Sequence, residues 1–83
     1  MYDVELTNEA QKFLRKLDKH EQEKILKKIY CIKENPISFL KKLSANHYWR
    51  LRIDDYRAIV DVVIIRQKII VLRIGHRKNM YGS

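Results

Sequence analysis

The hydrophobic positions near the start of the chain follow the period of a strand and then that of a helix. Residues 2–6 alternate between apolar and polar side chains, which predicts a short strand. Asn8 stands three residues before Gln11, which is a variant of the capping-box spacing, and a helical period runs over residues 10–17. The pattern therefore predicts a strand and then a helix capped by Asn8.

A second helix is predicted directly after the first. Asp18 stands three residues before Glu21, and isoleucines recur at positions 25, 29 and 32 with lysines outside them. The helix should end at Asn35-Pro36, because proline disfavours the helical conformation of the residue before it. Since almost no loop joins the two helices, we expect an antiparallel hairpin or a sharp corner.

The second half of the chain has the pattern of strands. After a connecting stretch, residues 37–46, three strand-like segments follow: 48–53, 56–64 and 69–74. We therefore expect a single α+β domain over residues 1–83, in the order strand–helix–helix–strand–strand–strand. The last three strands form an antiparallel meander, the helices pack on one face of the sheet, and arginines line its open face.

The charge of the chain points to a polyanionic partner. Eighteen lysines and arginines against ten acidic residues give a net charge of +8. Residues 1–41 carry nine basic and seven acidic side chains, whereas residues 42–83 carry nine and three, so the excess lies in the second half of the chain. Six of the seven arginines also lie there, and a guanidinium binds phosphate through a planar, bidentate fork.

Several classes of protein do not fit the sequence. The single cysteine, Cys31, has no partner for an internal disulfide and fits a reducing compartment, and no Cys/His cluster has zinc spacing. There is no glycine-rich phosphate loop and no apolar run long enough to span a membrane, and we expect no signal peptide, because the sequence opens directly into polar residues. We expect a cytoplasmic protein without metal or small-molecule cofactor.

Two groups of residues are candidates for chemistry. Arg50 and Arg52 point the same way from one strand, and Arg57 can return beside them on the next, which makes a cradle for successive phosphates. Alternatively, the three form a solvated face balanced by nearby aspartates. The second group follows Gly75 and comprises His76, Arg77, Lys78 and Tyr81. Histidine is the side chain best matched to proton transfer near neutral pH, and tyrosine can donate, accept or stack on a base.

These residues carry a resemblance to RelE-type toxins of the RelE/ParE superfamily. Residues 48–60, YWRLRIDDYRAIV, resemble the central strand pair of those toxins, and residues 74–81, IGHRKNMY, resemble their C-terminal signature. The opening strand, the helix pair and Lys42-Leu43 also fit. The resemblance implies a RelE-like fold and the toxin of a type II toxin–antitoxin pair. Such a toxin is a metal-independent endoribonuclease that cuts mRNA in the ribosomal A site and inhibits translation.

The resemblance also implies roles for individual residues. Arg57 would bind the scissile phosphate, Arg77 would stabilise the transition state, and Tyr81 would orient or deprotonate the attacking 2′-hydroxyl. The general base stays open between Tyr81 and His76. Arginine cannot fill that role in practice, because it does not lose its proton. The predicted RNA-backbone contacts are Arg50, Arg52, Lys42 and Lys78.

The implied partners are a cognate antitoxin and the ribosome with its mRNA. Two alternatives remain open: a ParE-type poison of DNA gyrase on the same scaffold, and a basic nucleic-acid-binding module without catalysis. Substitution of Arg77 or Tyr81 separates a nuclease from a simple binder, because only the nuclease loses orders of magnitude in rate.

Overall fold

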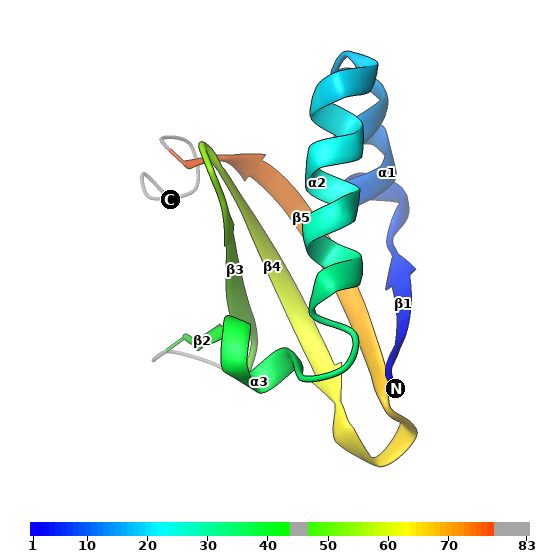
Figure 1. Cartoon of the computed structure of the whole chain (residues 1–83), viewed down its shortest axis with the longest axis vertical. Helices are drawn as coiled ribbons and strands as arrows, with labels where there is room; N and C mark the ends of the chain where they lie inside the picture. Colours follow the sequence, from blue (N-terminus) through cyan, green and yellow to red (C-terminus); the bar gives the residue numbers. More distant parts are fainter. Residues whose placement is uncertain (44–46, 78–83) are drawn as a thin grey trace.

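The computed structural model describes residues 1–43 and 47–77. Within them, five strands form one sheet in the order β1-β5-β4-β3-β2. The strands are β1 (Asp3–Leu6), β2 (Lys41–Lys42), β3 (Trp49–Ile53), β4 (Tyr56–Val63) and β5 (Lys68–His76). The helices are α1 (Asn8–Arg15), α2 (Lys19–Cys31) and the short α3 (Pro36–Phe39), and a 3-10 turn, η1 (Ile64–Arg66), joins β4 to β5. Figure 1 shows α1 and α2 beside β1 and β5, with β2, β3 and α3 on the other side of the molecule.

The predicted α+β order is confirmed, and so is the C-terminal meander. β3 pairs antiparallel with β4, and β4 with β5, while β1 adds to the far edge of β5 in parallel. A register shift at Ile59/Val60 interrupts the β4–β5 ladder. No described helix is long and apolar enough to cross a membrane.

The two long helices begin at side-chain caps, one of them at a residue other than predicted. At the start of α2, Asp18 accepts the backbone N–H of Glu21 at 2.9 Å, as its spacing predicted. At the start of α1 the cap is Thr7, which accepts the N–H of Ala10, so the prediction of Asn8 was one residue late. The Thr7 hydroxyl also donates to the Leu72 carbonyl at 2.6 Å, which fixes the start of α1 to β5.

The stretch predicted as a plain connection, residues 37–46, contains two short elements in its described part. Pro36 begins α3, since its fixed φ and missing N–H suit the first turn of a helix. β2 follows at once and pairs with β3, placing Lys41 opposite Arg50 and Lys42 opposite Trp49. Neither element is long enough to produce a readable hydrophobic period.

The core lies between the helices and one face of the sheet. The predicted stripe of α2 is confirmed, because Ile25, Ile29 and Ile32 are completely buried. They pack with alternate residues of the strands, among them Leu51 on β3 and Ala58 on β4. The residues between these positions point away from the helices, to the opposite face of the sheet.

Candidate functional site

Four arginines meet in one hollow on the face of the sheet away from α1 and α2. The hollow has a volume of about 280 Å³ and is lined by Phe39, Lys41, Arg50, Arg52, Arg57 and Arg77. We call it the arginine hollow. The structure therefore brings Arg50, Arg52 and Arg57 together, and Arg77 from the C-terminal group joins them.

Strand register explains how these side chains come together. Arg52 on β3 lies directly opposite Arg57 on β4, and Arg50 lies opposite Ile59 on the same face. On its other side, Arg57 lies opposite Gly75 of β5. Because glycine has no side chain, nothing from β5 projects over the Arg57 guanidinium at this position.

Arg57 differs from the other arginines in its burial. The sequence predicted an open face, but Arg57 is only 2 % exposed, whereas Arg52 and Arg77 are exposed. Its Nη1 donates to the carbonyl of Tyr56 at 3.5 Å. Arginine does not lose its proton in proteins, so the lining of the hollow includes a buried positive charge together with other cations. An anion that enters the hollow lowers the repulsion among them.

Arg77 is held by the turn between β3 and β4. Its backbone N–H donates to the carbonyl of Asp55 at 2.8 Å. The preceding turn residue, Asp54, has a φ of 50°, a left-handed conformation that Asp adopts more readily than most residues. The direction of this turn therefore sets where Arg77 enters the hollow.

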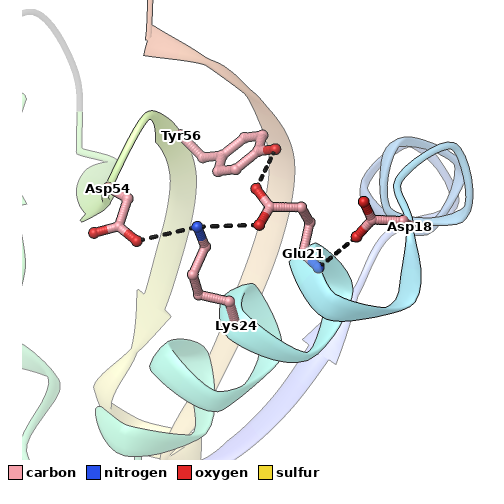
Figure 2. Close-up of polar contacts among 5 residues, drawn as sticks. All are labelled: Asp18, Glu21, Lys24, Asp54 and Tyr56. Carbon is pink, nitrogen blue, oxygen red and sulfur yellow. Dashed lines mark hydrogen bonds and ion pairs between the residues drawn. The ribbon is translucent and has the colours of Figure 1, made fainter.

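The same turn is tied to α2 by a chain of polar contacts (Figure 2). Lys24 Nζ lies 3.3 Å from Oδ2 of Asp54 and 3.1 Å from Oε2 of Glu21. The hydroxyl of Tyr56, at the start of β4, donates to Oε1 of Glu21 at 2.9 Å. Both strands that carry the hollow are thus joined to α2 close to the turn.

These contacts shift the pKa values of their members. The hydrogen bond from Tyr56, followed by that from Lys24, lowers the pKa of the Glu21 carboxyl below its usual value. Burial, followed by the hydrogen bond to Glu21, raises the pKa of the Tyr56 hydroxyl. The pKa of Lys24 is raised by its hydrogen bonds to Glu21 and then Asp54. Glu21 and Lys24 therefore stay charged, and Tyr56 stays neutral, over a wider pH range around pH 7 than they would in water.

Two of the other predicted residues lie outside the hollow. Lys42 follows Lys41 on β2 and points to the other side, where its Nζ lies 4.9 Å from the centre of the Trp49 ring. The ring of His76 packs beside Tyr56, at 4.8 Å between centroids, and near Phe13 of α1 at 6.1 Å. The structure thus brings His76 to the helix side of the sheet end. Lys78 and Tyr81 lie outside the described residues.

Two residues of the hollow were missed by the sequence analysis. Lys41 was overlooked because β2 was not predicted, and the pairing of Lys41 with Arg50 decides which of the two lysines faces the arginines. Phe39 ends α3 and is 47 % exposed, so its ring is accessible at the edge of the hollow. An apolar residue within a predicted connection, close to a lysine pair, was the only available signal.

The arrangement suits the binding of a phosphodiester with an exposed base. Guanidinium groups neutralise phosphate oxygens, and an exposed aromatic ring gives a base a surface on which to stack. No three His, Cys, Asp or Glu side chains of the described residues are grouped as a metal site requires. Charge stabilisation in the hollow itself comes from guanidinium and ammonium groups.

Comparisons with known proteins show the family and the fold of the chain. Residues 4–81 match the family described as ParE toxin of type II toxin-antitoxin system, parDE. No curated protein sequence matches the chain.

Three solved structures show the same fold. The toxin–antitoxin complex RelBE2 from Mycobacterium tuberculosis contains a chain with 22% identity and a TM-score of 0.83, covering 92% of this chain and 98% of that chain. The intact RelBE toxin–antitoxin complex of E. coli contains a chain with 23% identity and a TM-score of 0.78, and the match covers 92% of this chain and 96% of that chain. The RelB–RelE antitoxin–toxin complex of Methanococcus jannaschii contains a chain with 26% identity and a TM-score of 0.73, and the match covers 94% of this chain and 95% of that chain.

Proposed function

The chain belongs to the ParE toxin family of type II toxin–antitoxin systems, within the RelE/ParE superfamily, and from the arginines that it gathers in one hollow we propose that it is an mRNA endoribonuclease. One observation carries the proposal. The buried guanidinium of Arg57 lies in a hollow that Arg50, Arg52 and Arg77 also line. Such a group of fixed positive charges matches the transition state of phosphodiester cleavage, in which negative charge builds up on phosphorus-bound oxygens.

The proposed reaction is an attack of a ribose 2′-hydroxyl on the adjacent phosphorus. The bond from the 2′-oxygen to phosphorus forms, and the bond from phosphorus to the 5′-oxygen of the next nucleotide breaks. The products are a 2′,3′-cyclic phosphate and a 5′-hydroxyl. Arg57 holds the phosphate, and Arg77, which enters from the turn side, stabilises the added negative charge. The arginines of the hollow supply this stabilisation without a metal ion.

Proton transfer must be assigned to other groups, because arginine keeps its proton. A base takes the proton of the 2′-hydroxyl, and an acid returns one to the 5′-oxygen. Tyr81 and His76 remain the candidates. His76 adjoins Arg77 in sequence but packs beside Tyr56 on the helix side, so Tyr81, which lies outside the described residues, is our first choice for the base.

We place the substrate on the ribosome. An exposed arginine surface gives affinity for an RNA backbone but does not by itself hold the 2′-hydroxyl in line with the leaving oxygen. Correct orientation is worth about 7–11 kcal/mol in an intramolecular attack. A ribosome that distorts mRNA in its A site supplies that orientation, so naked RNA should be a poor substrate.

We also propose an antitoxin as the partner. The structural relatives named above were crystallised as toxin–antitoxin complexes. A polypeptide that covers the arginine hollow should carry acidic side chains, since complementary charge favours association with a basic surface. It inhibits by masking Arg50, Arg52 and Arg57 or by displacing the C-terminal segment. Full nuclease activity in the saturated complex would contradict this mode of inhibition.

The test is primer extension on an mRNA in a translating extract, with the same RNA free of ribosomes in parallel. We expect cuts within codons only when ribosomes are present, and their loss in Arg77→Ala. The matched control is Arg73→Ala, because Arg73 precedes Arg77 by four residues, on β5, but does not line the hollow and is exposed beside Glu9, with 3.7 Å between Nε and Oε2. Rapid cleavage of naked RNA at the same sites would disprove the need for the ribosome.

A second candidate is a poison of DNA gyrase, which the description of the matching family as ParE toxin favours. This activity needs a protein-binding surface and no nuclease centre. A supercoiling assay with purified gyrase separates the two functions. Inhibited supercoiling, together with an intact mRNA in the translating extract, would favour the gyrase poison over the nuclease.

A further inference from the structure

A second basic groove lies between α2 and the end of β3. Its volume is about 490 Å³, and it is lined by Lys24, Lys27, Lys28, Cys31, Arg52, Ile53 and Asp54. The one carboxylate in this lining, that of Asp54, is 3.3 Å from Lys24 Nζ. Within residues 1–43 and 47–77, neither Lys27 nor Arg52 forms an ion pair with any side chain. The groove therefore carries a positive charge that the ion pairs of the described residues do not fully compensate.

The lysines of the groove are arranged along one face of α2. Lys27 and Lys28 follow Lys24 by three and four residues, and Cys31 follows them by four and three, so these side chains lie on one side of the helix. This arrangement destabilises the helix, because like charges three or four residues apart on a helix repel each other. A bound polyanion removes this repulsion along the whole row.

The groove and the arginine hollow are adjacent at two points. Arg52 lines both of them. In addition, Lys28 Nζ of the groove lies 5.4 Å from the centre of the Phe39 ring, which lines the hollow. β2 pairs with β3 only at Trp49 and Arg50. Among the described residues, no strand therefore covers the edge of β3 at Arg52. One extended ligand can pass over this edge from the hollow into the groove.

We propose that the groove is a second RNA-binding site. It binds phosphates of the same RNA strand, next to the phosphate that is held in the arginine hollow. The inference rests on the proposed function, since it extends the same RNA beyond the cleavage site. Phosphate-binding cations on both sides of an exposed phenylalanine form the alternation of charge and stacking surface found where single strands bind. An acidic peptide would use the lysines but has no planar base to place on Phe39, so RNA is the occupant that accounts for both.

The chain provides its own reporter for this site, because its single cysteine, Cys31, is exposed and lines the groove. The probe is a 12-nucleotide 2′-O-methyl RNA, which has no 2′-hydroxyl and is not cut. We expect the bound oligonucleotide to slow alkylation of Cys31 by N-ethylmaleimide at least fivefold. Alkylation at an unchanged rate while the oligonucleotide is bound would overturn the proposal.

Binding of the same oligonucleotide as a function of salt gives an independent measurement. The double variant Lys27→Ala/Lys28→Ala should bind about tenfold more weakly at low salt. Its slope of log K against log salt should fall by about 1.4, or about 0.7 for each phosphate of the single strand that the variant no longer neutralises. The matched control is Lys12→Ala/Lys16→Ala, which removes the same charge from α1 and its C-cap and should keep the wild-type slope.

The outcomes separate this site from the proposed nuclease. Equal slopes in the two double variants overturn the groove site, while cuts in the translating extract still support the nuclease. Protection of Cys31 without any cuts supports the groove and contradicts the nuclease. If polyglutamate protects Cys31 and the oligonucleotide does not, the groove binds an acidic peptide and our proposal is wrong.

Discussion

Arg52 and Arg57 lie directly opposite each other on β3 and β4, and both line the arginine hollow. Like charges in directly opposed positions of an antiparallel pair are destabilising. Their close placement therefore works against folding in the absence of an anion and favours the binding of one. The pair is an example of a site that is maintained at some cost to stability.

This relationship predicts that Arg52→Gln stabilises the free protein. At low ionic strength the melting temperature should rise by about 1–8 °C, since the removed repulsion is of the order of 0.2–1 kcal/mol. The rise should shrink at high salt, where the charges are screened. Lys12→Gln removes one positive charge from exposed α1 and serves as the control. A larger rise in the control than in Arg52→Gln would show that the effect comes from net charge alone.

Arg57→Lys should lower the rate of ribosome-dependent cleavage by about 10²- to 10³-fold, as removal of one stabilising donor does in other enzymes. Lysine keeps the charge but lacks the rigid fork and the reach of a guanidinium at this buried position. The rate is measured by quantitative primer extension at saturating ribosomes. Arg73→Lys, on the neighbouring strand, should retain the wild-type rate, and a similar decrease there would contradict a specific role for Arg57.

Phe39→Leu should weaken binding of the 2′-O-methyl oligonucleotide about tenfold, within the range of about 1–3 kcal/mol for loss of one base–aromatic stack. Fluorescence anisotropy gives the dissociation constant. Tyr30→Leu is the matched control, because Tyr30 is an aromatic of similar exposure on α2, at 51 % against 47 % for Phe39. If both variants bind like the wild type, Phe39 does not stack on a base.

Tyr56→Phe should lower the melting temperature at neutral pH by about 4–8 °C, the shift that loss of about one hydrogen bond causes in a domain of this size. The difference should depend on pH. The pKa of Glu21 is lowered in the folded state. The ionised Glu21 therefore contributes to folding stability in full at a pH above its ordinary pKa, and this contribution is lost as the pH falls through the lowered pKa of the folded protein. Melting curves from about pH 7 to pH 3 test this, and a constant difference would exclude Glu21 as the partner that matters.

The same variant also reports on the turn. Tyr56, Glu21, Lys24 and Asp54 form the connection from β4 through α2 to the β3–β4 turn, whose Asp55 carbonyl receives the N–H of Arg77. At a temperature where Tyr56→Phe is fully folded, a looser turn should lower the cleavage rate more than it weakens oligonucleotide binding. Equal effects on both would mean that the connection serves stability alone.

The sequence by itself determined the elements with a long, clear period and the face on which their residues lie. Alternation in residues 48–53 put Arg50 and Arg52 on one face, and the short turn at Asp54-Asp55 returned Arg57 beside them. The isoleucine stripe of α2 and the Asp18 cap also followed from spacing alone. These features depend on residues close in the chain, where the geometry of helix and strand leaves few alternatives.

Only the tertiary structure decided which residues complete the site. Lys41 rather than Lys42 reaches the arginines because β2 pairs in one particular register, and a shift of one residue would exchange them. The burial of Arg57 beside Gly75, the position of Phe39, and the place of Arg52 between the arginine hollow and the groove depend on how β2, β3, β5 and α3 pack together. Pairing between distant segments is set by the packing of the whole domain, and no local period in the sequence encodes it.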